Sequence, residues 1–125
     1  MVSLYFRNAD GVMIVYDVTN EKSFSNVKNW YNLVSQQLKR TSIGIVANKS
    51  DCDDKSKKIK RENGIKLSKE LKASFFEVSA KSGKDIENAF IELAKTFRPK
   101  EHSTSPRLLG NDEVNQDNKV CCTLL

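Results

Sequence analysis

The sequence predicts an α/β fold in which three parallel strands alternate with helices. Three short apolar runs, at 12–16, 43–47 and 75–78, are continuous and rich in β-branched or aromatic residues, as in strands buried on both faces. A helical pattern follows each run, and the runs start 31 and 32 residues apart, close to the length of one strand–helix unit. This alternation favours a parallel sheet with right-handed crossovers.

The first helix is the most clearly marked. Apolar residues recur at steps of three and four, which places one apolar stripe toward the sheet. Thr19 or Asn20 stands just before it as a suitable N-cap. The stripe consists of Phe24, Val27, Tyr31, Val34 and Leu38.

The second helix is expected at 61–72, with Leu67 and Leu71 facing inward, although Gly64 lowers its helix propensity. A third helix is expected to end at Pro99. Its apolar face is predicted to comprise Ile86, Ala89, Phe90, Leu93, Ala94 and Phe97.

Length and composition restrict the class of protein. A chain of 125 residues with 38% hydrophobic and 30% charged residues can form one domain with a modest core. Its net charge of +5 permits contact with phosphate or an anionic membrane without requiring it. No apolar run approaches the roughly 20 residues that span a bilayer, and no signal segment is expected at the start. Three cysteines, two of them adjacent, form no disulfide framework and fit a reducing, cytosol-facing compartment.

The composition changes after the third helix. Residues 99–120 are rich in Pro, Ser, Thr, Asn and Asp and lack periodicity, which predicts a disordered linker. Its charges nearly cancel, so it is not a polybasic membrane arm. The basic cluster lies instead at 55–61, where a solvated loop is favoured over nucleic-acid binding.

Polar motifs directly follow the second and third predicted strands. The first is Asn48-Lys49-Ser50-Asp51 and the second is Ser79-Ala80-Lys81. Because ligands of parallel α/β sheets bind at the carboxyl ends of the strands, we expect both motifs to converge on one site.

A guanine ring explains these residue types. The carboxylate of Asp51 can accept hydrogen bonds from the ring N–H and the exocyclic amine of guanine, whereas adenine offers no such pair and leaves a polar group unpaired. Asn48 can serve the opposite edge through its amide, and Lys49 can lay its methylene stem over the ring. The backbone N–H of Ala80 can donate to the guanine carbonyl, and Lys81 can cover the other ring face.

Longer segments around these motifs resemble a family of proteins. The run YFRNA at 5–9 resembles a YYRGA-type segment, IVYDVT at 14–19 resembles LVYDxT, and FFEVSAK at 75–81 matches FFExSAK. The chain is thus similar to the C-terminal part of a Ras-superfamily small GTPase of the Rab family. The resemblance covers 1–98 and the last five residues. It implies a partial Ras-like, P-loop NTPase-type three-layer fold and GTP or GDP as ligand. The base-binding positions that it implies are Asn48, Lys49, Asp51, Ser79, Ala80 and Lys81.

The phosphate-binding motifs of such a family do not occur in the 125 residues. None of the five glycines belongs to a GxxxxGK[ST] loop or a DxxG element. A complete family member would carry three further strands before Met1. We therefore expect no Mg²⁺ site, no catalytic residues, weak binding through base contacts only and no GTP hydrolysis by this chain alone. His102 stands alone, so no metal-ligand spacing is found. We also expect 12–16 to form an open apolar edge, which is an aggregation hazard.

The chain finishes Cys121-Cys122-Thr123-Leu124-Leu125, and residues 121–125 fit a prenylation signal loosely, the final Leu favouring geranylgeranyl. The pair resembles the CCxxx ending of Rab proteins, and a second lipid on Cys121 would supply the second anchor that stable attachment needs. Unmodified surface cysteines are the alternative.

The resemblance therefore implies a function in vesicle traffic. It implies lipid anchoring at the cytoplasmic face of intracellular membranes, a cytosolic form when unprenylated, and prenylation machinery and Rab effectors as partners. A non-enzymatic lipid-anchored adaptor fragment and a non-functional truncation remain as alternatives.

Overall fold

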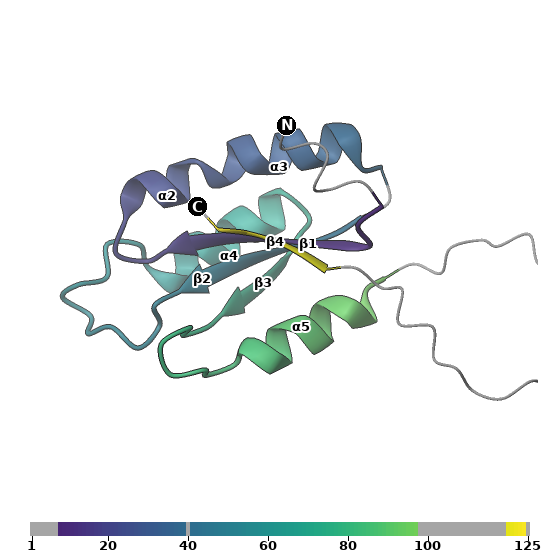
Figure 1. Cartoon of the computed structure of the whole chain (residues 1–125). Coiled ribbons are helices and arrows are strands. Elements are labelled where there is room, and N and C mark those ends of the chain that lie inside the picture. The colour runs from purple at the N-terminus through teal and green to yellow at the C-terminus, as the bar shows by residue number, and fades with distance from the viewer. Residues whose placement is uncertain (1–7, 40, 98–119, 125) are drawn as a thin grey trace, which may run out of the picture.

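The computed structural model describes residues 8–39, 41–97 and 120–124. A parallel sheet in the order β3–β2–β1–β4 forms the middle of three layers, with α2, α3 and α4 on one face and α5 on the other (Figure 1). The strands are β1 (Gly11–Asp17), β2 (Ser42–Asn48), β3 (Ser74–Glu77) and β4 (Val120–Leu124). The helices are α2 (Glu21–Ser25), α3 (Val27–Gln37), α4 (Arg61–Glu70) and α5 (Ile86–Lys95). The predicted three-layer α/β class is confirmed.

The three predicted strands are β1, β2 and β3, and their registers are parallel. Gly11 pairs with Ser42 and Asp17 with Asn48, so β1 and β2 end together. The register of β2 with β3 brings Ala47 opposite Glu77. All three strands therefore present their carboxyl ends at one edge of the sheet, which positions the loops that follow β2 and β3.

The face under α2, α3 and α4 holds the larger part of the core. The predicted first helix is divided in two at Asn26, which serves as the C-cap of α2. Of the two N-cap candidates the structure uses Asn20, whose side chain accepts a hydrogen bond from the Ser23 N–H at 3.1 Å. The predicted stripe is confirmed, because Val27 and Val34 are fully buried and the other members pack against the same cluster. Those members are Phe24, Tyr31 and Leu38.

Helix α4 is close to its predicted position and ends at Glu70 rather than at residue 72. Lys72 adopts a left-handed backbone with φ 54°, which ends the helical path. Gly64 is buried, and a Cβ there would lie 2.6 Å from the Phe75 ring and also meet the Tyr16 hydroxyl. The glycine that weakens the helix therefore allows it to approach the sheet closely.

Helix α5 covers the other face through Ala89 and Leu93, which are buried against β1 and β2 residues. The prediction that Phe90 and Ala94 also face inward was wrong, since both are exposed, Phe90 at 36%. Each lies one residue, or about 100° around the helix, after a buried residue, and therefore points to the side of the contact. The helix ends at Lys95, and the predicted stop at Pro99 lies outside the described residues.

The expectation of an open β1 edge was wrong. Val120–Leu124 forms β4 and pairs with β1 in parallel, from Gly11↔Val120 to Val15↔Leu124 (Figure 1, yellow beside purple). Val120 was assigned to the linker but belongs to this strand. The predictions for 1–7 and for the linker at 99–119 fall outside the described residues. None of the helices in the described ranges is long and apolar enough to cross a membrane.

Candidate functional site

Two loops meet at the carboxyl ends of β2 and β3, as the sequence predicts. The Ser50 N–H donates to the Val78 carbonyl at 3.1 Å, and the Val78 N–H donates to the Ala47 carbonyl at 2.9 Å. These backbone bonds extend the pairing of the two strands past their ends. The side chains of the two motifs are thereby brought together.

Asp51 and Ser79 form the central contact of the site. The fully buried Ser79 hydroxyl donates to Asp51 Oδ1 at 2.5 Å and accepts from the Ser82 N–H at 3.2 Å. The Ser79 backbone is fixed as well, because its N–H donates to the Lys84 carbonyl and its carbonyl accepts from the Gly83 N–H. The Asp51 carboxylate is exposed and is held by a rigid partner at one oxygen.

The Asp51 carboxylate is stabilised in its charged form. The hydrogen bond from Ser79 is the main cause that lowers its pKa below the ordinary value, and the positive charges of Lys81 and Lys49 lower it further. Lys81 is itself exposed. A carboxylate has about four lone-pair directions, so Asp51 can accept hydrogen bonds beyond the one from Ser79.

Asn48 and Ala80 also meet across the two loops. The Ala80 N–H donates to Asn48 Oδ1 at 3.1 Å. The sequence analysis assigned this N–H to a guanine carbonyl, but in the structure it serves to join the loops. A base carbonyl would take this N–H by displacing the Asn48 oxygen from it.

Lys49 is the first residue after β2 and has a left-handed backbone with φ 66°. Its ammonium lies 2.7 Å from Asp17 Oδ2, at the end of β1. This contact directs the side chain across the edge of the sheet. The hydrogen bond from Lys49 to Asp17 raises the pKa of the lysine.

Asp17 is a residue of the site that the sequence analysis did not single out. The Thr19 N–H and hydroxyl donate to its Oδ1 at 2.8 and 2.7 Å, while Lys49 occupies its other oxygen. Burial alone would raise the pKa of this carboxyl, but the hydrogen bonds from Lys49 and Thr19 outweigh it and the pKa is lowered. The sequence could have identified Asp17 by its position at the end of the first apolar run, because β1 ends at the same edge of the sheet as β2.

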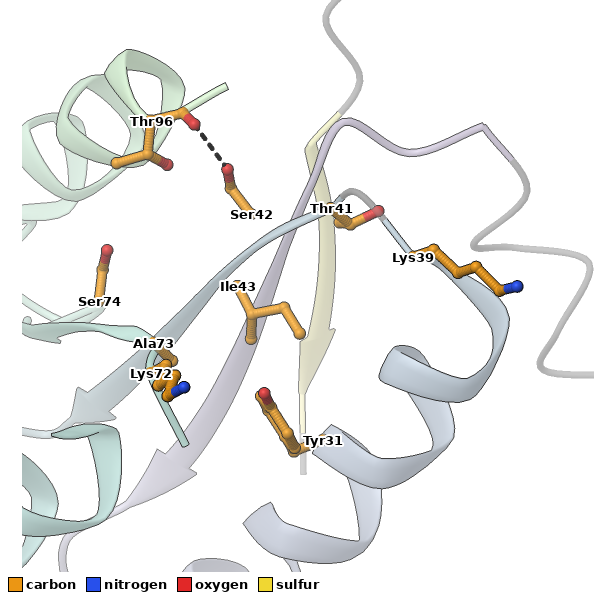
Figure 2. A pocket seen from close by; sticks show the side chains of 9 residues that line it. All are labelled: Tyr31, Lys39, Thr41, Ser42, Ile43, Lys72, Ala73, Ser74 and Thr96. Carbon is orange, nitrogen blue, oxygen red and sulfur yellow. Dashed lines mark hydrogen bonds between the residues drawn. The ribbon is translucent and has the colours of Figure 1, made fainter. Parts of the chain in front are cut away.

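Two hollows of the described structure lie beside the candidate site or at the opposite edge of the sheet. One of about 420 Å³ lies where β2 and β3 begin, at the opposite edge of the sheet (Figure 2). The Ser42 hydroxyl at its rim donates to the Thr96 carbonyl at 3.0 Å, drawn as the dashed line in Figure 2, and the Thr41 hydroxyl donates to Ala9. Another of about 590 Å³ borders the candidate site only through Ser50 and Lys84. The candidate site itself is formed by two loops, in which Asp51, Ala80 and Lys81 are exposed.

Cys52 follows Asp51 and is a free, half-buried thiol. Its N–H donates to the Lys49 carbonyl at 3.1 Å, which closes the turn that carries Asp51. In the described ranges, no three His, Cys, Asp or Glu side chains are grouped so that they could hold a metal ion.

Comparison with known proteins identifies the family of the chain. The model of the Ras family matches residues 1–99. Ras-related protein Rab-8A of Gallus gallus is 42% identical over 124 residues, and Rab-8A of Rattus norvegicus is 35% identical over 125 residues. Ras-related protein Rab-8B of Bos taurus is 41% identical over 101 residues, or 80% of this chain. The chain therefore belongs to the Ras family, in its Rab branch. It covers 58% of the length of these Rab-8A relatives and 48% of that of Rab-8B.

Proposed function

We propose that the chain recognises the guanine base of GTP or GDP through the loops that follow β2 and β3. The observation that carries the proposal is the 2.5 Å hydrogen bond from Ser79 to Asp51, which fixes a charged carboxylate at the end of β2. Guanine presents two adjacent donors, the ring N–H and the exocyclic amine, and this carboxylate accepts both. Adenine has an acceptor at the first position and no amine beside it. Such a mismatch typically gives discrimination on the order of 10⁴-fold.

The other residues of the site support the base from its edges and faces. Asn48 and Ala80 are joined by a hydrogen bond and face the carbonyl edge of the base, where the Ala80 N–H changes its acceptor on binding. The methylene stem of Lys49 covers one face of the ring, and its ammonium remains on Asp17. Lys81 covers the other face.

Binding by the 125-residue chain is weak, and GTP is not hydrolysed. In phosphoryl transfer the protein contributes mainly positioning and charge stabilisation by a phosphate-binding loop, its Lys and Mg²⁺. The 125 residues contain no GxxxxGK[ST] loop and no DxxG element. The base contacts alone therefore provide recognition without chemistry, and we assign no catalytic residue and no metal ligand.

The proposal includes attachment to a membrane. Residues 1–98 are the partial Rab-like domain, 99–120 the linker, whose last residue contributes to β4, and 121–125 the signal for lipidation. Each thiol, at Cys121 and Cys122, loses its proton and forms a thioether with a geranylgeranyl group, whose diphosphate leaves. Two lipid chains hold the protein at the cytoplasmic face of intracellular membranes, whereas one chain gives only reversible binding. We propose vesicle traffic as the process, and prenylation machinery and effector proteins as partners; membership of the Rab branch supports this proposal.

Calorimetric titration with GDP and ADP tests base recognition. We expect GDP but not ADP to bind the full chain. Asp51→Ala lowers the affinity for GDP at least about tenfold, because hydrogen bonds to a charged group contribute about 1.5–3 kcal/mol each. The matched control is Asp53→Ala, an exposed carboxylate in the same loop, which leaves the affinity unchanged.

Two results would contradict the proposal. Equal GDP affinity of the Asp51→Ala and Asp53→Ala variants would show that the Asp51 carboxylate does not read the base. Phosphate release from GTP above the rate in buffer, abolished by Asp51→Ala, would show that the chain hydrolyses GTP by itself.

A further inference from the structure

The carboxylate of Asp17, at the end of β1, contacts the loops that follow two neighbouring strands. Its Oδ1 accepts from the Thr19 N–H at 2.8 Å and from the Thr19 hydroxyl at 2.7 Å. Its Oδ2 lies 2.7 Å from the ammonium of Lys49, the first residue after β2. Both oxygens are therefore engaged, one in the turn after β1 and the other by the NKxD loop.

The turn after β1 holds Asp17 without help from Lys49. The Asp17 N–H donates to the hydroxyl of the buried Ser23 at 3.0 Å, and the Asp17 carbonyl accepts from the Asn20 N–H at 3.0 Å. With the two bonds from Thr19, these contacts fix the backbone and one carboxylate oxygen. The side chain is only 22% exposed. Asp17 is thus a fixed acceptor at the carboxyl edge of the sheet.

Lys49 depends on this acceptor for its direction. Its side chain is 50% exposed, and within the described ranges the ion pair with Asp17 is the contact that its ammonium makes. A long, half-exposed lysine side chain otherwise samples many rotamers, and ordering it costs conformational entropy. The Asp17 carboxylate therefore determines how the methylene stem of Lys49 runs across the edge of the sheet.

A second carboxylate in the same loop competes for Lys49. Asp51 follows Lys49 by two residues and uses one oxygen for the hydrogen bond from Ser79, which leaves other lone pairs for a ligand. If Lys49 were released from Asp17, Asp51 would be an alternative partner for its ammonium. An ion pair there would occupy the oxygens that the proposed function assigns to the base.

We propose that Asp17 is a positioning residue of the base site, which holds the Lys49 stem where it covers the ring and keeps the ammonium away from Asp51. This inference rests on the proposed recognition of guanine. Asp17 acts through Lys49 and is assigned no contact with the base. Because the stem is ordered before the ligand arrives, less binding free energy is lost to side-chain ordering. Because Asp51 remains unmasked, its carboxylate can accept both guanine donors.

A double-mutant cycle on GDP affinity, measured by calorimetry with the full chain, tests the inference. Asp17→Asn keeps an oxygen for Thr19 but turns an amide nitrogen, which cannot accept, toward Lys49. Lys49→Met keeps an unbranched stem and removes the ammonium. We expect each change alone to weaken GDP binding about three- to tenfold, the effect of ordering one long side chain. Asp17→Asn should cause no further loss in the Lys49→Met chain, because the two residues act as one unit.

Two further variants complete this experiment. Glu70→Gln removes the carboxylate of another exposed lysine pair, with Lys28 at 2.9 Å, and leaves GDP affinity unchanged. Thr19→Val removes one donor to Asp17 and keeps both charges of the ion pair, so it serves if the Asp17→Asn chain does not fold. It should weaken GDP binding in the parent chain and have no effect in the Lys49→Met chain.

A second readout needs no nucleotide and does not follow general stability. The pKa of the Asp51 carboxyl is measured by NMR titration of the free chain. In Asp17→Asn the released ammonium of Lys49 approaches Asp51, so the pKa of Asp51 falls below its value in the parent chain. In the Lys49→Met chain no ammonium can be released, and adding Asp17→Asn there leaves the pKa of Asp51 close to unchanged.

Two outcomes overturn the inference. Losses of GDP affinity that add in the cycle would show that Asp17 does not act through Lys49. An unchanged pKa of Asp51 in the Asp17→Asn chain would show that the lysine does not turn to Asp51 when it is released. If no chain binds GDP while the pKa of Asp51 shifts as expected, base recognition is contradicted and the positioning of Lys49 by Asp17 is supported.

Discussion

Ser79 determines how Asp51 is presented at the end of β2. The serine is fully buried and has both its backbone and its hydroxyl engaged, so it forms a fixed point from which the exposed carboxylate is held. An exposed aspartate in a loop would otherwise sample several rotamers. The entropic cost of ordering the Asp51 side chain is incurred on folding. A ligand that binds this carboxylate therefore loses less binding free energy to side-chain ordering.

Removing the Ser79 hydroxyl should raise the pKa of Asp51. The hydrogen bond from Ser79 is the main cause of the lowered pKa, so in Ser79→Ala the value moves up toward the ordinary value of about 3.9. Carboxyl chemical shifts followed by NMR during a pH titration measure it. Ser82→Ala is the control, since it removes a neighbouring hydroxyl that does not contact Asp51 and keeps the Ser82 N–H. An unchanged pKa of Asp51 in Ser79→Ala would contradict the assigned cause.

The sequence predicted that the loops after β2 and β3 meet, but not all of the contacts that these loops make. That Asp51 and Ser79 meet followed from the rule that parallel strands end at one edge. That Lys49 pairs with Asp17 depends on the left-handed backbone of Lys49, and that the Ala80 N–H bonds to Asn48 depends on the separation of two loops. Neither feature has a local pattern in the sequence.

Among the elements, the strands were predictable and the helices less so. Continuous apolar runs identify strands buried on both faces, and β1, β2 and β3 lie where the runs are. The division between α2 and α3 at Asn26 has no such signal, because the apolar stripe continues across it. The width of the buried face of α5 was overestimated for a related reason. Periodicity locates the centre of a stripe, whereas the neighbours that pack against the helix decide its width.

Replacing Gly64 by alanine tests how closely α4 packs against the sheet. In an exposed helix Ala is more favourable than Gly by about 1 kcal/mol, but here a Cβ would lie 2.6 Å from the Phe75 ring. Overpacking in a core typically costs about 1–3 kcal/mol. We therefore expect Gly64→Ala to lower the free energy of unfolding by up to about 2 kcal/mol, measured by urea denaturation.

Asn63→Ala is the matched control for that prediction. Asn63 is the exposed neighbour on the same helix, so its replacement improves helix propensity without entering the core and raises the free energy of unfolding by a few tenths of a kcal/mol. A Gly64→Ala chain as stable as the Asn63→Ala chain would show that α4 can move away from the sheet without cost.

At the scale of the whole molecule, the sequence analysis did not predict strand β4, which pairs with β1. Its residues are a short apolar run beyond a polar stretch, which is also the pattern of a free terminal tail. The partner of the strand lies more than a hundred residues earlier, and no local signal reports such a pairing. The sequence analysis therefore expected 12–16 to form an open apolar edge, whereas in the structure residues 120–124 pair with it.

The ion pair between Asp17 and Lys49 joins the ends of β1 and β2 and makes the stability of the whole fold depend on pH. The pKa of Asp17 is lowered in the folded chain, so its contribution is present above the ordinary value of about 3.9 and is lost as the pH falls through the folded pKa. The pKa of Lys49 is raised, so its contribution is present below about 10.4 and is lost as the pH rises through the folded pKa. The stabilisation by this pair therefore extends across the neutral range.

Asp17→Asn tests this dependence, because asparagine keeps an oxygen that accepts from Thr19 and removes the charge that faces Lys49. We expect the variant to be less stable than the parent in urea denaturation at pH 7 and at pH 5, and the difference to shrink as the pH falls below about 4, where the parent aspartate becomes protonated as well. Glu92→Gln removes the carboxylate of an exposed pair on α5, with Lys95 at 2.9 Å, and should change stability little at each of these pH values. A difference for Asp17→Asn that is the same at pH 7 and pH 3 would mean that the shape of the side chain, rather than its charge, stabilises this edge of the sheet.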